Sequence, residues 1–433
     1  MRESLIIRFK KIFSGTFVLR AVSLGMLPFY TKWLSVDEYG QFSLLIASIN
    51  IISTILSFNL FESIVVFAEK DNIEPKKSLK ILHSFIFYLL IITVFVSILY
   101  NSIHKVIEFN TLIYIFIGVF IQVSFLLIKS LSIVTRNSTI HVKRQFIETV
   151  VVLVLSVSSM LLFTQYVYNA RVYSLLIGQL ISIFVVYKIS FYSVRFLRSN
   201  RRFIIKCIKF SLPKMPFILS GILLSQIDRF IIEDLSGLTK TAYYSVAYTF
   251  AGTSSILAGV FWQAKTTDIY EDLGSENGLK SNYFNKYFIY YGLFILILSV
   301  FLGPIMNLLL EKQYNESISL VPFICLGYFF FFSSGIYNRI VEYSEKTFLL
   351  IPGVLVSLIL NIVLNYWLIP IFDYKIAALT TVVSYTCQLL LTMILVKSRL
   401  KLSLDVKPLL LVSIILVLFM TILHNWYKYI YEI

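Results

Sequence analysis

The sequence predicts an all-α polytopic membrane protein with twelve membrane spans and a further C-terminal span. Its 433 residues are 58% hydrophobic and only 14% charged, whereas a soluble domain carries about 25% charged residues. Apolar runs of about 20 residues recur along the chain, and each is long enough to cross roughly 30 Å of hydrocarbon. Backbone groups in lipid find no water to pair with, so these runs must be helices.

The spans follow from the apolar runs and the polar stretches between them. The first twelve are expected at 12–34, 41–66, 81–101, 111–133, 146–166, 172–192, 210–232, 241–264, 286–310, 318–340, 347–370 and 375–396. A thirteenth is expected at 409–426. The basic start, MRESLIIRFKKIF, leads into a full-length apolar run without a small-residue cleavage site, so we expect a retained first helix rather than a removed signal peptide.

The placement of charge predicts the orientation. The net charge is +15, which in a soluble protein would suggest nucleic-acid binding. With a cytoplasmic N-terminus, 27 of the 38 Lys and Arg residues lie in or beside cytoplasmic loops, six lie on the other side, and five lie within spans. This asymmetry follows the positive-inside rule. It predicts a multi-pass membrane protein with its N-terminus in the cytoplasm and no nucleic-acid partner.

Two pseudo-symmetric lobes of six helices are expected, at 1–192 and 210–396. A basic cytoplasmic linker, 193–209, joins them, and 397–433 adds a basic loop and the thirteenth span. The halves resemble each other weakly, because LSVDEYGQFSLL follows the first span and LSGLTKTAYYSVA follows the seventh. Transporters with internal repeats place the substrate path where the halves meet.

Ionisable residues inside spans mark the candidate site, because a charge at bilayer depth costs about 2.5–3.5 kcal/mol on insertion scales. Arg20 lies deep in the first span on a mostly polar helical stripe, so it either lines a polar cavity or forms a buried structural pair. Glu62, near the end of the second span, either titrates during transport or pairs with Arg20 or Lys129.

The seventh span, FSLPKMPFILSGILLSQIDRFII, carries the most polar face. Lys214, Asp228 and Arg229 project within about 100° of arc, together with small polar residues. Such a stripe could guide an anionic substrate along the helix. The alternative is that Asp228 and Arg229 pair with each other and anchor the external interface.

No motif for enzyme chemistry is found. The sequence has no GxxxxGK[ST], HExxH or GxSxG, so it gives no sign of nucleotide hydrolysis or of metal- or serine-dependent catalysis. Its three cysteines have no CxxC spacing and its four histidines no metal-ligand spacing. We therefore expect a protein that is not an enzyme and has no cofactor, with coupling to a gradient of an unidentified ion left open.

Several stretches resemble one family over nearly the whole chain. They are PFYTKWLSVDEYG, the seventh span quoted above, AYYSVAYTFA, EKQYNESISLVPFICLGYFF and LNIVLNYWLIPIFDYKIAALTTVVSY. They are similar to the polysaccharide-exporter branch of the multidrug/oligosaccharidyl-lipid/polysaccharide superfamily, and more narrowly to the flippases of O-antigen and capsule repeat units. The chain departs from that pattern at 373–375, where members often have a glycine-rich turn, and in its thirteenth span.

The resemblance implies a central cavity between two six-helix lobes that opens alternately to each side of the membrane. It implies a cargo of one oligosaccharide repeat unit on undecaprenyl diphosphate, with Arg20, Lys214 and Arg229 as candidate contacts for the anionic diphosphate. Membrane lipids, a polysaccharide polymerase and a chain-length regulator are the partners that it suggests.

Two other functions compete with this one. A drug or metabolite exporter of the same superfamily would share the fold, but cationic drugs favour acidic cavities, and the charges within these spans are mainly basic. A membrane polymerase or ligase of polysaccharide assembly commonly carries a long external loop, whereas the external loops expected here are short.

Overall fold

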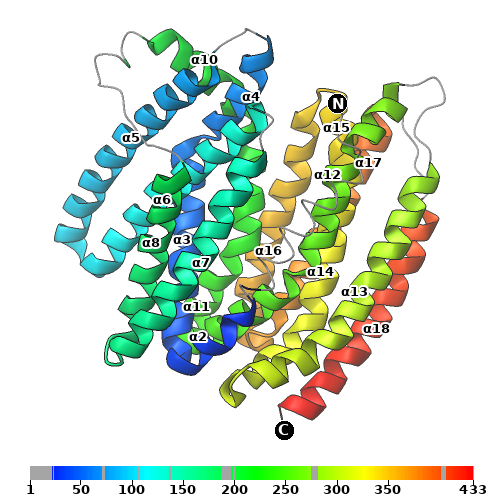
Figure 1. Ribbon diagram of the computed structural model, residues 1–433. Coiled ribbons are helices and arrows are strands. Elements are labelled where there is room, and N and C mark those ends of the chain that lie inside the picture. The colour runs from blue at the N-terminus through cyan, green and yellow to red at the C-terminus, as the bar shows by residue number, and fades with distance from the viewer. Residues whose placement is uncertain are drawn as a thin grey trace. The chain divides into compact units, whose positions relative to one another are not determined.

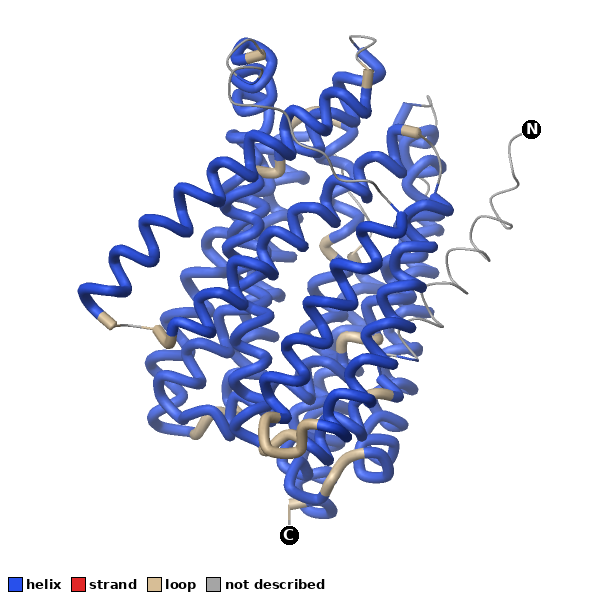
Figure 2. The backbone as a smooth tube through the Cα atoms, turned by 60° about the vertical axis from the view of Figure 1, so that its left-hand side comes forward, coloured by secondary structure: helices blue, strands red, loops and turns tan. Residues whose placement is uncertain are grey.

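The computed structural model is helical throughout the residues that it describes, which are 22, 24–70, 74–105, 107–135, 138–186, 197, 200–274, 281–400 and 406–432. Figure 2 shows helices joined by short loops, and no strand occurs within these ranges. The predicted all-α membrane fold is confirmed. The chain divides into two compact units, one of Met1–Gln41 with Leu223–Ile433 and one of Phe42–Ile222, hereafter unit 1 and unit 2.

Unit 2 contains long apolar helices and three shorter elements (Figure 1). Helix α3 (Val36–Ser57) enters it from unit 1, and the other elements are α4 (Leu60–Lys70), α5 (Pro75–His104), α6 (Phe109–Val134), α7 (Ser138–Leu162), α8 (Val167–Val186), α10 (Arg201–Ser211) and the 3-10 turn η1 (Leu212–Lys214). Residues 201–209 of the predicted linker are therefore helical.

Unit 1 begins with α2 (Leu27–Trp33) and resumes within α11 (Met215–Ala251). It continues through α12 (Ser254–Gly274), α13 (Ser281–Leu309), η2 (Lys312–Leu320), α14 (Val321–Ser333), α15 (Gly335–Tyr343), η3 (Thr347–Leu350), α16 (Ile351–Phe372), α17 (Ile376–Leu400) and α18 (Lys407–Tyr431). Its border differs from that of the predicted lobes, because the end of the first span groups with the second half of the chain.

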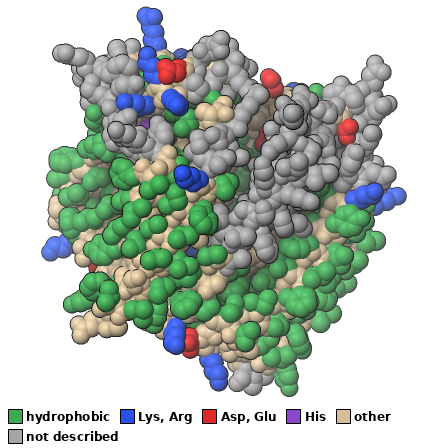
Figure 3. Space-filling view, viewed as in Figure 1, with side chains coloured by type: hydrophobic (Ala, Val, Ile, Leu, Met, Phe, Trp, Pro, Cys, Tyr) green, Lys and Arg blue, Asp and Glu red, His purple; other side chains and the backbone are tan. Residues whose placement is uncertain are grey.

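Eleven helices in the described ranges are long and apolar enough to cross a membrane. They include α18, which corresponds to the expected thirteenth span. Residues 12–21 and 23 of the first expected span lie outside the described residues. Large apolar side chains are exposed along these helices, for example Ile103 at 75% and Leu308 at 83%, as lipid-facing positions should be. Figure 3 shows hydrophobic atoms over much of the visible face that is described.

Several expected spans are broken rather than straight. In α11 the break is at Gly237, whose φ of 84° is left-handed backbone that glycine adopts at little cost. The eighth expected span consists of the end of α11 and α12, and the tenth consists of α14 and α15. Such interruptions free backbone groups for other partners, and this is tolerated in membranes where the backbone is buried in protein.

Helix α18 is built into unit 1 through one tyrosine. The Tyr427 hydroxyl lies 2.7 Å from the carbonyl oxygen of Ser299 and 2.8 Å from that of Val300, and it accepts the N–H of Gly303 at 3.3 Å. Proline at 304 has no N–H, so the carbonyl of Val300 lacks its usual helical donor. The tyrosine therefore supplies hydrogen bonds at the proline site of α13. Only glycine fits at position 303, because a Cβ there would lie 2.3 Å from the phenol ring of Tyr427.

Candidate functional site

Asp228 is a carboxylate enclosed by three helices of unit 1. It lies on α11 before the Gly237 break and is 1% exposed. Its Oδ2 accepts the hydroxyl of Tyr244, from the same helix after the break, at 2.6 Å, and the hydroxyl of Thr381 on α17 at 2.8 Å. Its Oδ1 accepts the amide of Asn365 on α16 at 2.7 Å.

A second layer of amides and hydroxyls surrounds this carboxylate. The side-chain oxygen of Asn365 accepts the hydroxyl of Thr380, and its amide nitrogen also lies 3.3 Å from the side-chain oxygen of Asn361. Both asparagines are fully buried. We call Asp228, Tyr244, Asn361, Asn365, Thr380 and Thr381 the Asp228 cluster.

The chemistry of the Asp228 cluster suits a small monovalent cation or a proton. Its groups present carboxylate, amide and hydroxyl oxygens, which are the ligands of hard cations. No direct ion pair with the Asp228 carboxylate occurs within the described residues, although the charge of Arg229 acts on it at longer range, and a buried charge without a direct partner is costly unless it is neutralised. Binding a proton or a cation would neutralise it. No group of three or more His, Cys, Asp or Glu side chains able to hold a metal occurs in the described chain.

The alternative interpretation required Arg229 to pair with its neighbour Asp228, but no ion pair joins them. Its guanidinium donates to the Ser225 carbonyl at 2.9 Å and to the Gln226 side-chain oxygen at 3.0 Å. Its central carbon lies 4.7 Å from the centroid of the Tyr248 ring. The two charged neighbours thus leave α11 in different directions, so the predicted stripe is not continuous at its distal end.

Lys214 belongs to unit 2, whereas the Asp228 cluster belongs to unit 1. It ends the turn η1 and is half-buried, with its Nζ 4.8 Å from the centroid of the Phe210 ring. Arg20 lies outside the described residues, so its role in contacting cargo stays a prediction.

The position predicted for Glu62 is wrong. The second span ends at Ser57 rather than at residue 66, because Phe58 and Asn59 both adopt positive φ and so end the helix. Glu62 is exposed in the first turn of α4, where it accepts a hydrogen bond from the Asn59 side chain. The Asn-x-x-Glu spacing is close to a capping box, a helix-start signal that the sequence offered.

Two buried arginines were missed because their positions were assigned to loops or span ends. Arg144 is 4% exposed on α7 and pairs with Glu148 at 2.7 Å, which also accepts the amide of Gln179 at 2.9 Å. Arg171 is 7% exposed on α8 and donates to the Ser156 hydroxyl at 3.3 Å. The four-residue spacing of Arg144 and Glu148 was the available signal for the first pair.

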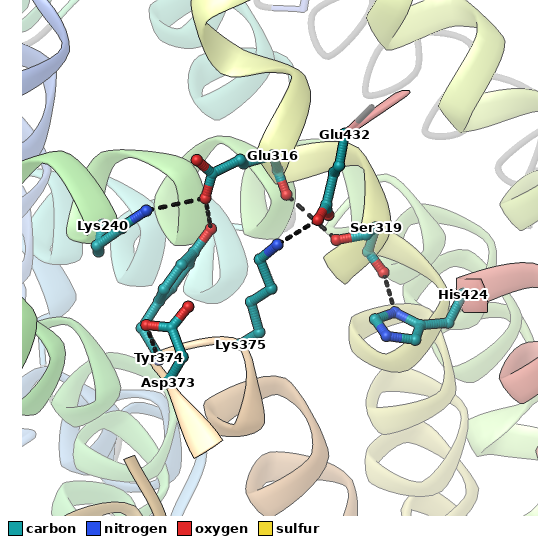
Figure 4. Close-up of polar contacts among 8 residues, drawn as sticks. All are labelled: Lys240, Glu316, Ser319, Asp373, Tyr374, Lys375, His424 and Glu432. Atoms are coloured by element: carbon teal, nitrogen blue, oxygen red, sulfur yellow. Dashed lines mark hydrogen bonds and ion pairs between the residues drawn. The ribbon is translucent and has the colours of Figure 1, made fainter. Parts of the chain in front are cut away.

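A polar network joins the turn after α16 to η2, α11 and the end of α18 (Figure 4). Glu316 accepts from Lys240 at 2.9 Å and from the Tyr374 hydroxyl at 3.2 Å. Lys375 pairs with Glu432. Burial, reinforced by the charge of Glu316, raises the pKa of the Tyr374 phenol above its usual range, so it stays a hydrogen-bond donor.

The two segments that sequence similarity relates, which lie in the first turn of α3 and at the break of α11, also touch each other within unit 1. Thr239 donates to the carboxylate of Asp37. A Cβ at Gly40 would lie 2.3 Å from the carbonyl oxygen of Leu238, so only glycine permits this approach. The Tyr39 ring packs edge-on against Tyr314 at 6.0 Å. We call the pair of segments 37–40 and 237–239 the loop contact.

Comparison with known families gives the identity of the chain at family level. The model of the polysaccharide biosynthesis protein family matches residues 11–265, which is more than half of the chain. The chain belongs to this family. A comparison with curated protein sequences gives no significant match.

Solved structures show that this polysaccharide biosynthesis protein has a transporter fold. It is similar to the lipid II flippase MurJ in an inward closed conformation, with a TM-score of 0.66 at 15% identity over 97% of this chain and 98% of that one. It is similar to an inward-facing multidrug resistance MATE transporter of the MOP superfamily, with a TM-score of 0.58 at 12% identity over 88% and 94%. A MOP superfamily transporter from Pyrococcus furiosus Vc1 gives 0.51 at 13% identity over 92% and 95%.

Proposed function

We propose that this protein is a flippase that moves oligosaccharide repeat units linked to undecaprenyl diphosphate across the bacterial inner membrane. Two findings together support the proposal: the chain belongs to a polysaccharide biosynthesis family, and it shares its fold over nearly the full chain with the lipid II flippase MurJ. Lipid II is itself a lipid-linked saccharide. The cargo would serve assembly of O-antigen or capsule, with the polymerase and chain-length regulator as partners.

Alternating access is the mechanism that we propose. Transporters with internal repeats expose a fixed site to each side in turn by moving one repeat against the other. In this chain the loop contact joins a segment of the first half to a segment of the second half. It would close one side of the transport path and would have to separate when that side opens.

Ion coupling would act through the Asp228 cluster. A proton or monovalent cation bound there would neutralise the Asp228 carboxylate and change its bonds to Asn365 and Thr381, which lie on two other helices. A ligand shifts a conformational equilibrium only by binding one state better than the other. The α11 helix, which is broken at Gly237 between Asp228 and Tyr244, is the element that such binding would bias.

The cargo diphosphate would be met by basic groups, with Arg20, Lys214 and Arg229 as candidates. Arg20→Lys keeps the charge but loses the bidentate fork that suits phosphate, so we expect partial activity. Arg20→Ala and Arg20→Glu should abolish surface glycan at normal protein abundance. If Arg20 instead forms a structural pair, Arg20→Ala will lower protein abundance.

The test is reconstitution of the full chain in liposomes that contain a fluorescent undecaprenyl-diphosphate oligosaccharide in both leaflets. A membrane-impermeant reagent that destroys the fluorophore should bleach the whole pool when the protein is active and only the outer half in empty liposomes. The proposal would be rejected if the glycolipid flips no faster than in empty liposomes while a thermal-shift assay shows that the protein is folded.

A drug exporter is the second candidate, because MATE transporters share the fold. The same liposomes can be loaded with a cationic dye. Dye movement without movement of the glycolipid would favour the exporter.

A further inference from the structure

The amphipathic helix α10 and the turn η1 form a basic segment, of which only Lys214 is a candidate contact for the cargo. The segment holds five basic residues, and the sequence has no Asp or Glu between Glu148 and Asp228. Four of the five are exposed, namely Arg201, Arg202, Lys206 and Lys209. No acid within this segment neutralises the charge of the face.

Apolar side chains lie along one edge of the same face. Ile205 is 37% exposed and Leu212 is 51% exposed. At 100° per residue they project beside Arg201, within about 40° of it. The opposite side of α10 is closed, because Ile204 and Cys207 are buried. The exposed side therefore combines cations with aliphatic groups.

Aromatic contacts hold the helix onto α4. The Phe67 and Phe210 rings lie 5.2 Å apart, and the Nζ of Lys206 lies 4.4 Å from the centroid of the Phe67 ring. These contacts fix which side of α10 faces outwards. Stems of lysine and arginine can lie on apolar surface while their charged ends reach a polar phase.

Neighbouring elements of unit 2 reinforce the positive charge. The first turn of α5 adds exposed Lys76 and Lys77, and among the described side chains of this region Glu62 on α4 and Glu74 are exposed acids. Figure 1 places α10, α4 and the start of α5 at the same end of this unit. Basic side chains are visible at that end in Figure 3.

We infer that α10 lies in the membrane interface and binds the headgroups of anionic phospholipids. Its cations meet the lipid phosphates, while Ile205 and Leu212 enter the boundary between headgroups and acyl chains, as in interfacial amphipathic helices. Exposed aliphatic residues beside cations fit a lipid surface better than they fit the diphosphate of a cargo molecule, which needs charge alone. Because α10 leads through η1 into α11, bound lipid would also fix the start of the helix that carries Asp228.

The experiment measures the binding of short-chain phosphatidylglycerol to the full-length protein in detergent, by native mass spectrometry. The variant R201Q/R202Q/K206Q/K209Q removes the four exposed cations and leaves Lys214 in place. Each cation near an anionic lipid surface is worth about fivefold in affinity. We expect the variant to bind at least about tenfold more weakly, with phosphatidylcholine binding unchanged.

The matched control removes four exposed cations at other helix ends, K143Q/K346Q/K397Q/R399Q. It has the same net charge as the test variant and should bind phosphatidylglycerol like the wild type. If the quadruple variant fails to fold, the double variant R201Q/R202Q leaves the Lys206 contact intact. Its affinity for phosphatidylglycerol should still fall by about an order of magnitude.

Equal loss in the test and control variants would overturn the inference, because net charge alone would then explain the binding. Unchanged phosphatidylglycerol binding in the folded test variant would also overturn it. The inference would likewise be overturned if the test variant still binds phosphatidylglycerol but no longer binds undecaprenyl-diphosphate glycolipid, because the basic face would then bind the cargo.

Discussion

Asp228 is the residue through which we propose that ion coupling acts. Its carboxylate is fully enclosed and receives three hydrogen bonds from Tyr244, Thr381 and Asn365. Hydrogen bonds to a charged group are worth about 1.5–3 kcal/mol each, so the cluster stabilises the ionised form even without a cationic partner. That form persists only while the hydroxyl and amide donors point inwards. Protonation or cation binding would release some of them.

Asp228→Asn tests this role with little change of shape. The amide cannot ionise, so the variant should fold, move glycolipid slowly, and gain nothing from an imposed proton or sodium gradient. The measurement is the flipping rate in liposomes with and without the gradient. Asp234→Asn is the control, because Asp234 is exposed on the same helix and its variant should respond like the wild type. A gradient response in Asp228→Asn equal to that of the wild type would remove Asp228 from coupling.

At the scale of elements, α18 supplies hydrogen-bond partners for backbone groups of α13. Tyr427 is fully buried and bonds to three backbone groups of α13, within little more than one helical turn before a proline. Unsatisfied carbonyls in a dry interior are costly, so the C-terminal helix is part of the unit rather than an appendage. The Lys375–Glu432 pair and the bond of His424 to the Ser319 carbonyl, at 2.7 Å, fasten the same helix farther along (Figure 4).

Tyr427→Phe should destabilise the protein by about 1–3 kcal/mol, because it leaves buried backbone groups of α13 without partners. The measurement is the Tm of the purified protein in detergent. Tyr429→Phe removes the same hydroxyl from a side chain that is 72% exposed and should leave Tm unchanged. Equal Tm values for the two variants would show that α13 needs no help from α18.

At the scale of the whole molecule, the proposed alternating access predicts that the loop contact opens during transport. Cysteines at Asp37 and Thr239, in a chain without its three native cysteines, should form a disulfide because the two side chains are hydrogen-bonded. Oxidation should stop transport, and reduction should restore it. The control pair is Ser159→Cys with Ser174→Cys, whose hydroxyls lie 2.7 Å apart in unit 2. Full transport by the oxidised Asp37–Thr239 pair would exclude this contact as a gate.

Orientation is a second property of the whole molecule. The charge asymmetry predicts a cytoplasmic N-terminus, and therefore a cytoplasmic position 199 and an external position 236. Single cysteines at Ser199 and Ser236 can be labelled in intact cells with an impermeant thiol reagent. Position 236 should react and position 199 should not. The reverse pattern would invert the topology.

The class of the protein and the order of its helices were determined by the sequence alone. Membrane helices are required wherever apolar runs are long enough, and this is a local property of composition. The thirteenth span was predicted, whereas the break at Phe58 and Asn59 was missed, although the Asn-x-x-Glu spacing was available as a signal. Charge placement also predicted an orientation, because the number of basic residues in each loop is likewise a local property of the sequence.

Only the tertiary structure decided which polar residues meet. Asp228 and Arg229 are neighbours in sequence, yet one turns towards Thr381 and the other towards Tyr248. The partners of Asp228 on α16 and α17 lie 137 and 153 positions away along the chain. Neither partner is charged, so nothing in the sequence distinguishes these two residues from other polar residues in the spans. Such contacts depend on how whole helices pack, because a buried carboxylate takes its donors from whichever helix faces it rather than from its own segment.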